Sequence, residues 1–163
     1  MATRDVALEL VRLEATPEEL DEIRELWKRH SIAEENRDLP GLLSTLTEDC
    51  VYELVGWNRR WEGLDGAASF YASLLGAFPD IDFRLTDIVI GPQGVCEEAD
   101  VVGTHERDWA GVPATGERLE WKVVIFFPWD RQARKFRGEK IYVEGLHPLT
   151  AERASPPDAA RSS

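Results

Sequence analysis

The acid best placed for chemistry lies near the end of the chain. Residues 136–144 (Phe-Arg-Gly-Glu-Lys-Ile-Tyr-Val-Glu) alternate with the period of two of a half-buried strand, and Glu139 shares its phase with Ile141 and Val143. A carboxylate on an apolar face is costly to desolvate unless it is paired, protonated or facing a polar cavity. Two interpretations stay open. Glu139 reaches solvent or an arginine at the strand's start, or it is a cavity carboxylate suited to acid–base work.

Two other side chains are candidates for the same site. Tyr52 lies in a segment rich in β-branched and aromatic residues, where it is either a core residue with a satisfied hydroxyl or a ligand contact. His105 is either a neutral base or donor paired with Glu139, or an outward residue between Thr104 and Glu106. We favour the outward orientation for His105.

A strand over residues 119–127 supplies the apolar wall that such a site needs. Leu119, Trp121, Val123, Ile125 and Phe127 fall on one face at the period of a strand. We expect this face to enclose a hollow. The candidate substrate-binding residues are the following apolar and aromatic side chains: Leu54, Trp57, Trp61, Tyr71, Trp121, Val123, Ile125 and Ile141.

Three of these candidates have a plain structural alternative. Trp57 and Trp61 flank two arginines, so they form either a stacking rim around a ligand or an ordinary surface turn. Tyr71 belongs to an aromatic stripe at helical spacing, a pattern that is typical of core packing.

Three helices are expected to position these residues. Thr16-Pro-Glu-Glu19 combines a capping box with a proline at the first helical position, so a helix begins there and places Leu20, Ile23, Trp27 and His30 on one face. The break at 36–41 predicts a short second helix over 42–46 that packs against the first. Asp65 is the expected N-cap of a third, amphipathic helix that ends before Pro79.

The strands follow mainly in the second half of the chain. We expect strands at 50–56, 81–86, 95–108, 119–127 and 136–144, with a turn or short strand at 57–61. Turn signatures at 91–94 and 111–116 indicate hairpins. Helices segregated from hairpin-linked strands indicate an α+β fold with a largely antiparallel sheet.

Composition limits the classes of function. A chain of 163 residues is expected to form one domain, here 1–148, followed by a mobile tail at 149–163. The formal charge of -12 and the pI near 4.7 argue against nucleic acid and membrane partners. Cys50 and Cys96 lack the spacing of a metal site or redox pair, so we expect no metal. The N-terminus lacks a secretory pattern, and the expected location is cytoplasmic.

Four segments together resemble a known superfamily. They are Glu62-Gly-Leu-Asp-Gly-Ala-Ala-Ser-Phe-Tyr at a helix start, Thr104-His105, the turn Gly111-Val-Pro-Ala-Thr-Gly116, and Ile141-Tyr-Val-Glu144 at the end of the last strand. With them, residues 15–145 resemble the SnoaL-like (polyketide cyclase-like) branch of the nuclear-transport-factor-two-like superfamily. This resemblance implies a cone-shaped, curved, mostly antiparallel sheet wrapped around a pocket.

The resemblance also implies where relatives keep their reactive groups. SnoaL-type cyclases use an acid at the position of Ile141 and a histidine near Ile125, limonene-epoxide-hydrolase-like members use an aspartate at Ile141, and steroid-isomerase-like members use one near Leu54. All three positions are apolar in this chain. The polar candidates that remain are Glu139, Tyr52 and His105.

Two hypotheses of different class follow. In the first, the cone binds a small apolar or cyclic metabolite, and Glu139 catalyses cyclisation, isomerisation or dehydration by proton transfer, without metal or organic cofactor. In the second, the chain is a non-catalytic ligand-binding or dimerisation module. We expect a homodimer through the sheet face, with Trp121, Phe126, Phe127 and Trp129 providing apolar area for cavity or interface.

Overall fold

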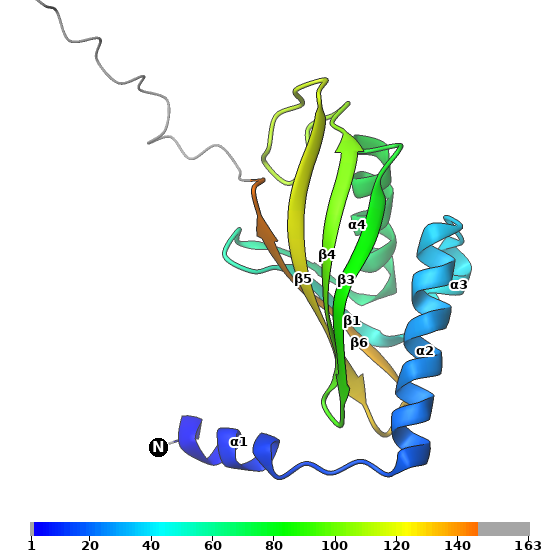
Figure 1. Cartoon of the computed structure of the whole chain (residues 1–163), viewed down its shortest axis with the longest axis vertical. Helices are drawn as coiled ribbons and strands as arrows, with labels where there is room; N and C mark the ends of the chain where they lie inside the picture. Colours follow the sequence, from blue (N-terminus) through cyan, green and yellow to red (C-terminus); the bar gives the residue numbers. More distant parts are fainter. Residues whose placement is uncertain (1, 147–163) are drawn as a thin grey trace, which may run out of the picture.

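The computed structural model describes residues 2–146, and the expected mobile tail lies outside them. Within this range four helices and six strands follow one another in the order expected, with one helix added at the N-terminus (Figure 1). The elements are α1 (Ala2–Val11), α2 (Pro17–Glu35), α3 (Leu39–Leu43), β1 (Leu46–Leu54), β2 (Arg59–Glu62), α4 (Gly63–Ala77), β3 (Asp82–Gly91), β4 (Gly94–Thr104), β5 (Arg118–Asp130) and β6 (Lys135–Glu144).

The six strands form a single sheet in the order β2-β1-β6-β5-β4-β3. Neighbouring strands are antiparallel except β1 and β6, which run parallel. The sheet twists strongly along its length, and α2 and α4 lie to one side of it (Figure 1). The fold is therefore α+β as predicted, and the parallel pair brings Tyr52 of β1 opposite Glu139 of β6.

The start of α2 follows the capping pattern in the sequence. The Thr16 side chain accepts a hydrogen bond from the Glu19 backbone N–H at 3.2 Å, and Pro17 occupies the first turn. The next helix differs from expectation, because α3 spans Leu39–Leu43 rather than 42–46. The reason is a second cap: Asp38 accepts from the Gly41 N–H at 3.1 Å, so the helix begins earlier and β1 takes over at Leu46.

The cap of α4 also differs from expectation. The helix begins at Gly63, Glu62 holds the N-cap position without a side-chain hydrogen bond, and Asp65 lies inside the first turn. An acid in that turn still interacts favourably with the positive end of the helix dipole. The helix buries Phe70 and Tyr71 against the sheet, as its apolar stripe predicts.

The glycine that precedes Glu139 allows β6 to lie close to β1. Gly138 has φ of 103°, and a Cβ there would lie 2.0 Å from the Val51 carbonyl oxygen of β1. Only glycine allows β1 and β6 to approach so closely. The register between these strands also shifts between Leu46 and Val51. This irregularity fixes the local backbone from which Glu139 projects inward.

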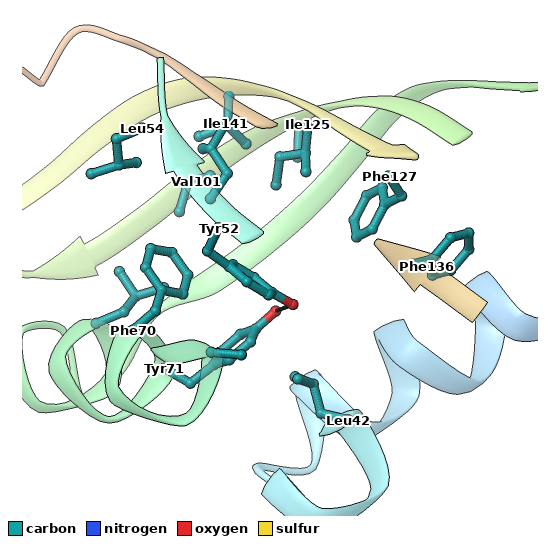
Figure 2. Packing of buried hydrophobic residues seen from close by; sticks show 14 of the residues in the cluster. Leu42, Tyr52, Leu54, Phe70, Tyr71, Val101, Ile125, Phe127, Phe136 and Ile141 are labelled. Atoms are coloured by element: carbon teal, nitrogen blue, oxygen red, sulfur yellow. Dashed lines mark hydrogen bonds between the residues drawn. The ribbon is translucent and has the colours of Figure 1, made fainter. Parts of the chain in front are cut away.

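The core lies between the helices and the inner face of the sheet. Trp121, Val123, Ile125 and Phe127 of β5 are each at most 5% exposed, as their spacing predicts. Figure 2 shows aromatic and aliphatic side chains from β1, α4, β5 and β6 meeting in this space. Each large apolar side chain buried in this way contributes about 1.5–3 kcal/mol. No helix within residues 2–146 is long and apolar enough to cross a membrane.

Candidate active site

Glu139 lies inside the protein. It is 3% exposed, and its Oε1 accepts a hydrogen bond from the Tyr71 hydroxyl at 2.8 Å. The same oxygen lies 3.1 Å from His30 Nε2, from α2. Of the two orientations left open by the sequence, the inward one is confirmed, and the partners are a histidine and a tyrosine rather than an arginine.

The hydrogen-bond network limits the protonation of His30 and Glu139 to two arrangements. Thr45 Oγ1 donates to the Leu42 carbonyl at 2.6 Å, so toward His30 Nδ1, 2.6 Å away, it can only accept. His30 therefore carries a proton on Nδ1, as assigned from its neighbours. The contact between His30 Nε2 and Glu139 Oε1 then holds one shared proton. The pair is either imidazolium and carboxylate, or imidazole and carboxylic acid.

Two tyrosines extend this network from the opposite side. The Tyr71 hydroxyl donates its hydrogen to Glu139, so the Tyr52 hydroxyl, 3.3 Å away, donates to the Tyr71 oxygen. Figure 2 shows the two hydroxyls meeting between β1 and α4. Burial, with the Glu139 carboxylate as a second cause, raises the pKa of both tyrosines well above the ordinary value. Both hydroxyls therefore stay protonated and serve as donors.

Glu139 also lines a pocket enclosed by apolar side chains. The cavity is small, with about 20 Å³ open to the centre of a water molecule, and the 370 Å³ of space between atoms around it includes open solvent. A ring-sized ligand therefore requires lining side chains to move apart. Both hydrogen bonds to Glu139 end on Oε1, not on Oε2. One oxygen of the carboxyl group is thus held by the protein, while the residue faces a hollow lined by Trp121, Val123, Ile125 and Ile141.

A second carboxyl group, Glu34, lines the same pocket and was not among the sequence candidates. It lies one helical turn after His30 on α2, so both side chains project to the same side. Burial raises the pKa of Glu34 well above the ordinary value, and the charges of Glu139 and Glu97 raise it further. The apolar stripe of α2, continued from Trp27 and His30 by one more turn, is the signal that could have revealed Glu34.

Glu97 on β4 is a third inward-facing acid near this network. Its Oε2 accepts a hydrogen bond from the Trp27 indole N–H at 2.7 Å. Burial raises the pKa of Glu97 to about 7, although this hydrogen bond opposes the shift. Within residues 2–146, however, no three acidic, histidine or cysteine side chains are arranged to hold a metal ion.

Three of the remaining candidate substrate-binding residues lie outside the pocket lining. Leu54 is fully buried in the core and is not part of the pocket lining. Trp57 and Trp61 are half-buried and pack on Trp109 and Phe70, with ring centroids 5.8 and 5.1 Å apart. They support the pocket wall from behind rather than facing its interior.

The predicted orientation of His105 is wrong. We favoured an outward side chain, but His105 is fully buried and stacks on Phe78 with centroids 4.6 Å apart. Thr104 takes the outward position because Asp80 accepts from its N–H at 2.6 Å and from its hydroxyl at 2.8 Å. Within the described residues neither ring nitrogen of His105 has a hydrogen-bond partner, so it is not paired with Glu139. Burial lowers the pKa of His105.

Comparison with known proteins identifies the family. The model of the SnoaL-like domain matches residues 27–137. The chain belongs to the SnoaL-like domain family. Its match runs from the middle of α2 to the start of β6 and ends two residues before Glu139. No curated protein sequence matches the chain significantly.

Solved structures of this SnoaL-like fold are similar over most of their length. AclR from Streptomyces galilaeus, a proposed hydroxylase, has 21% identity and a TM-score of 0.62, covering 77% of this chain and 90% of its own. A proposed SnoaL-like polyketide cyclase from Jannaschia sp. CCS1 has 16% identity, a TM-score of 0.64 and coverages of 80% and 90%. An LEH-like epoxide hydrolase from M. tuberculosis has 18% identity, a TM-score of 0.59 and coverages of 76% and 84%. Such distant likeness shows the fold and leaves the activity to the residues.

Proposed function

We propose that this SnoaL-like protein catalyses cofactor-independent proton transfer on a small cyclic molecule bound in the pocket. The support is the arrangement of Glu139, whose Oε1 is held by Tyr71 and His30 while the residue faces an apolar hollow. A carboxylate removed from water and fixed in orientation is a suitable general base. As part of the same proposal, the protein acts in the cytoplasm.

The proposed step begins with a carbonyl compound whose neighbouring carbon carries an acidic C–H. Glu139 takes that proton through Oε2, and the C–H electron pair moves into the carbonyl group to give an enolate. The indole N–H of Trp109, which lines the pocket and has no acceptor among residues 2–146, is a donor available to the enolate oxygen. Where a C=C bond is conjugated with the enolate, return of the proton to the far carbon of this dienolate would complete an isomerisation.

The same enolate leads to the other two reactions considered. Expulsion of a hydroxyl group β to the carbonyl, which takes the proton from Glu139 and leaves as water, is a dehydration. Attack of the enolate carbon on a second carbonyl of the same molecule, whose oxygen takes that proton, is a cyclisation. In each case the held oxygen and the two tyrosines keep the geometry of Glu139 unchanged through the cycle.

A simple C–H acid tests this proposal without knowledge of the natural substrate. 2-Tetralone is a small cyclic ketone with an acidic C–H between its carbonyl and aromatic ring. The protein is expected to accelerate incorporation of deuterium from D₂O at that carbon, followed by NMR. Glu139→Gln should lose this acceleration, while Glu144→Gln, an exposed acid on the same strand, should keep it. Equal exchange by the two variants would exclude Glu139 as the base.

A non-catalytic role is the second candidate. The family resemblance places the reactive groups of relatives at positions that are Ile141, Ile125 and Leu54 in this chain, and these apolar residues favour passive binding. Binding of 2-tetralone without any exchange of its C–H would support this alternative over catalysis.

Dimerisation through the outer sheet face belongs to the same alternative. Trp121, Phe127 and Trp129 are buried in their own chain, but Val89, Val124 and Tyr142 are 66%, 38% and 49% exposed on the strands. These side chains are available to a second copy. Sedimentation equilibrium at micromolar concentration should show a dimer that Val124→Glu weakens; a monomeric wild-type protein would contradict this proposal.

A further inference from the structure

The ionisable side chains that line the pocket are all acidic. Glu34 and Glu139 are the two ionisable side chains in its lining, and no lysine or arginine lines it. His30, the nearest cationic candidate, already has both ring nitrogens engaged by Thr45 and by Glu139 with Tyr71. An anionic ligand would therefore lie beside carboxyl groups with no cationic side chain free to pair with it, which costs several kcal/mol.

The apolar lining of the pocket combines aliphatic side chains with four aromatic ones. Phe70, Phe83, Trp109 and Trp121 line the same pocket from α4, β3, the loop after β4, and β5. Aromatic faces attract a desolvated cation through the ring quadrupole, and tryptophan does so most strongly. Carboxyl groups combined with aromatic walls match the chemistry of a protonated amine carried on a flat ring.

A second hollow beside the pocket also carries mainly acidic side chains. This second hollow has about 610 Å³ of space between atoms, part of it open solvent, and it shares Glu34, Ile81 and Phe83 with the pocket. Glu35 and Asp82 add two further acids to this second hollow, whose single basic residue is Arg37. The Arg37 guanidinium donates to the carbonyls of Pro79 and Ile81 at 3.1 and 3.4 Å, so part of its donor capacity is used. Together with the net charge of -12, the second hollow attracts cations and repels carboxylates.

One buried donor in the wall also lacks its partner. Trp109 is 5% exposed, and within the described residues its Nε1–H has no acceptor. A buried unsatisfied N–H is costly, and because Trp109 lines the pocket, an occupant with an acceptor atom within reach of this N–H would remove that cost. A ligand whose ring bears an ammonium group and an oxygen atom offers a donor to the two acids and an acceptor to the indole N–H.

We infer that the pocket selects a ring-bearing amine in its protonated form, with the ammonium group between Glu34 and Glu139. This inference rests on the proposed function, because it assigns the substrate class of the same pocket. In an amino ketone, the ammonium would lie toward Glu34 while Oε2 of Glu139 reaches the acidic C–H and the Trp109 N–H reaches the carbonyl oxygen.

Binding of such a cation should be linked to protons. Glu34 is surrounded by Glu139, Glu97, Arg37, Tyr71 and His30, and burial together with the neighbouring acids raises its pKa well above the ordinary value. An ammonium group beside it favours the ionised carboxylate, so Glu34 releases a proton on binding. Affinity for an amine should therefore rise with pH until the amine itself loses its charge.

Three related probes test the inference by calorimetry. They share one ring skeleton: 2-aminotetralin is cationic, 2-tetralol is neutral and tetralin-2-carboxylate is anionic. At pH 7.5 the amine should bind about tenfold more tightly than the alcohol, as expected for a partly desolvated cation. The carboxylate should bind least. Titrations in buffers of different ionisation enthalpy should show proton release with the amine alone.

Matched variants assign the preference to Glu34. Glu34→Gln should remove both the amine preference and the proton release, whereas Glu25→Gln, an exposed position on the same helix with the same charge change, should keep them. Thermal unfolding would verify that both variants fold. Equal binding of amine and alcohol, or no binding of either, would overturn the inference. Exchange of 2-tetralone by the wild-type protein is measured separately, so the proposed function can stand if the amine preference fails.

Discussion

Removal of one hydroxyl group gives a sharp test of the buried network. In Tyr71→Phe the ring contacts with Tyr52 and Phe70 remain, with centroids 5.5 and 5.3 Å apart, but the 2.8 Å hydrogen bond to Glu139 Oε1 is lost. A hydrogen bond to a charged or proton-sharing group is worth about 1.5–3 kcal/mol, so the free energy of unfolding should fall by about 2 kcal/mol. For a chain of this length that corresponds to a decrease in Tm of about 6 °C.

The assay is urea unfolding followed by tryptophan fluorescence, with thermal unfolding as a second measurement. Tyr142→Phe is the matched control, because Tyr142 is 49% exposed on β6 and has no side-chain hydrogen bond within the described residues. This control should change the free energy of unfolding by less than about 0.5 kcal/mol. If Tyr71→Phe were as stable as the control, the Tyr71 hydroxyl would not donate to Glu139, and the order of donors from Tyr52 through Tyr71 to Glu139 would be refuted.

Three further predictions concern stability. Burial raises the pKa of Glu97 to about 7, so between about pH 4.5 and 7 native Glu97 keeps a proton that the unfolded chain has lost. The wild type should therefore lose stability relative to Glu97→Gln as pH rises through about 4.5 to 7, measured by urea unfolding at each pH; parallel pH profiles would contradict this. Thr16→Ala removes the cap of α2 and should cost about 1 kcal/mol in the same assay, and no loss would mean that the cap is dispensable. Gly138→Ala places a Cβ 2.0 Å from the Val51 carbonyl oxygen and should cost more than about 3 kcal/mol; a stable variant would show that β1 and β6 can separate.

The orientation of Glu139 was predictable because strand periodicity is a local property. Ile141 and Val143 follow it on the same face, and one slip of register would have reversed all three. His105 lies where β4 ends, and there no run of alternating residues continues past Thr104 to define the face. Its burial depends on Asp80, which comes from another element and holds Thr104 outward.

The partners of Glu139 could not be read from the sequence for a different reason. His30 and Tyr71 lie 109 and 68 residues away, and they meet Glu139 because β6 pairs in parallel with β1 between the helices. Long-range pairing of this kind leaves no local pattern. Glu34 was missed because an acid among many acids on α2 looks like part of a solvated face, although its spacing from His30 places it, half-buried, at the pocket.

The exchange of the 2-tetralone C–H with D₂O tests the central claim most directly, because it reports on the reactivity of Glu139 itself. A positioned general base contributes about 10²–10⁴-fold, so the wild-type rate should exceed that of Glu139→Gln by at least about a hundredfold, with the ketone bound equally by both proteins. Equal exchange rates in two folded, ketone-binding proteins would show that this carboxyl group holds the core together and does no proton transfer.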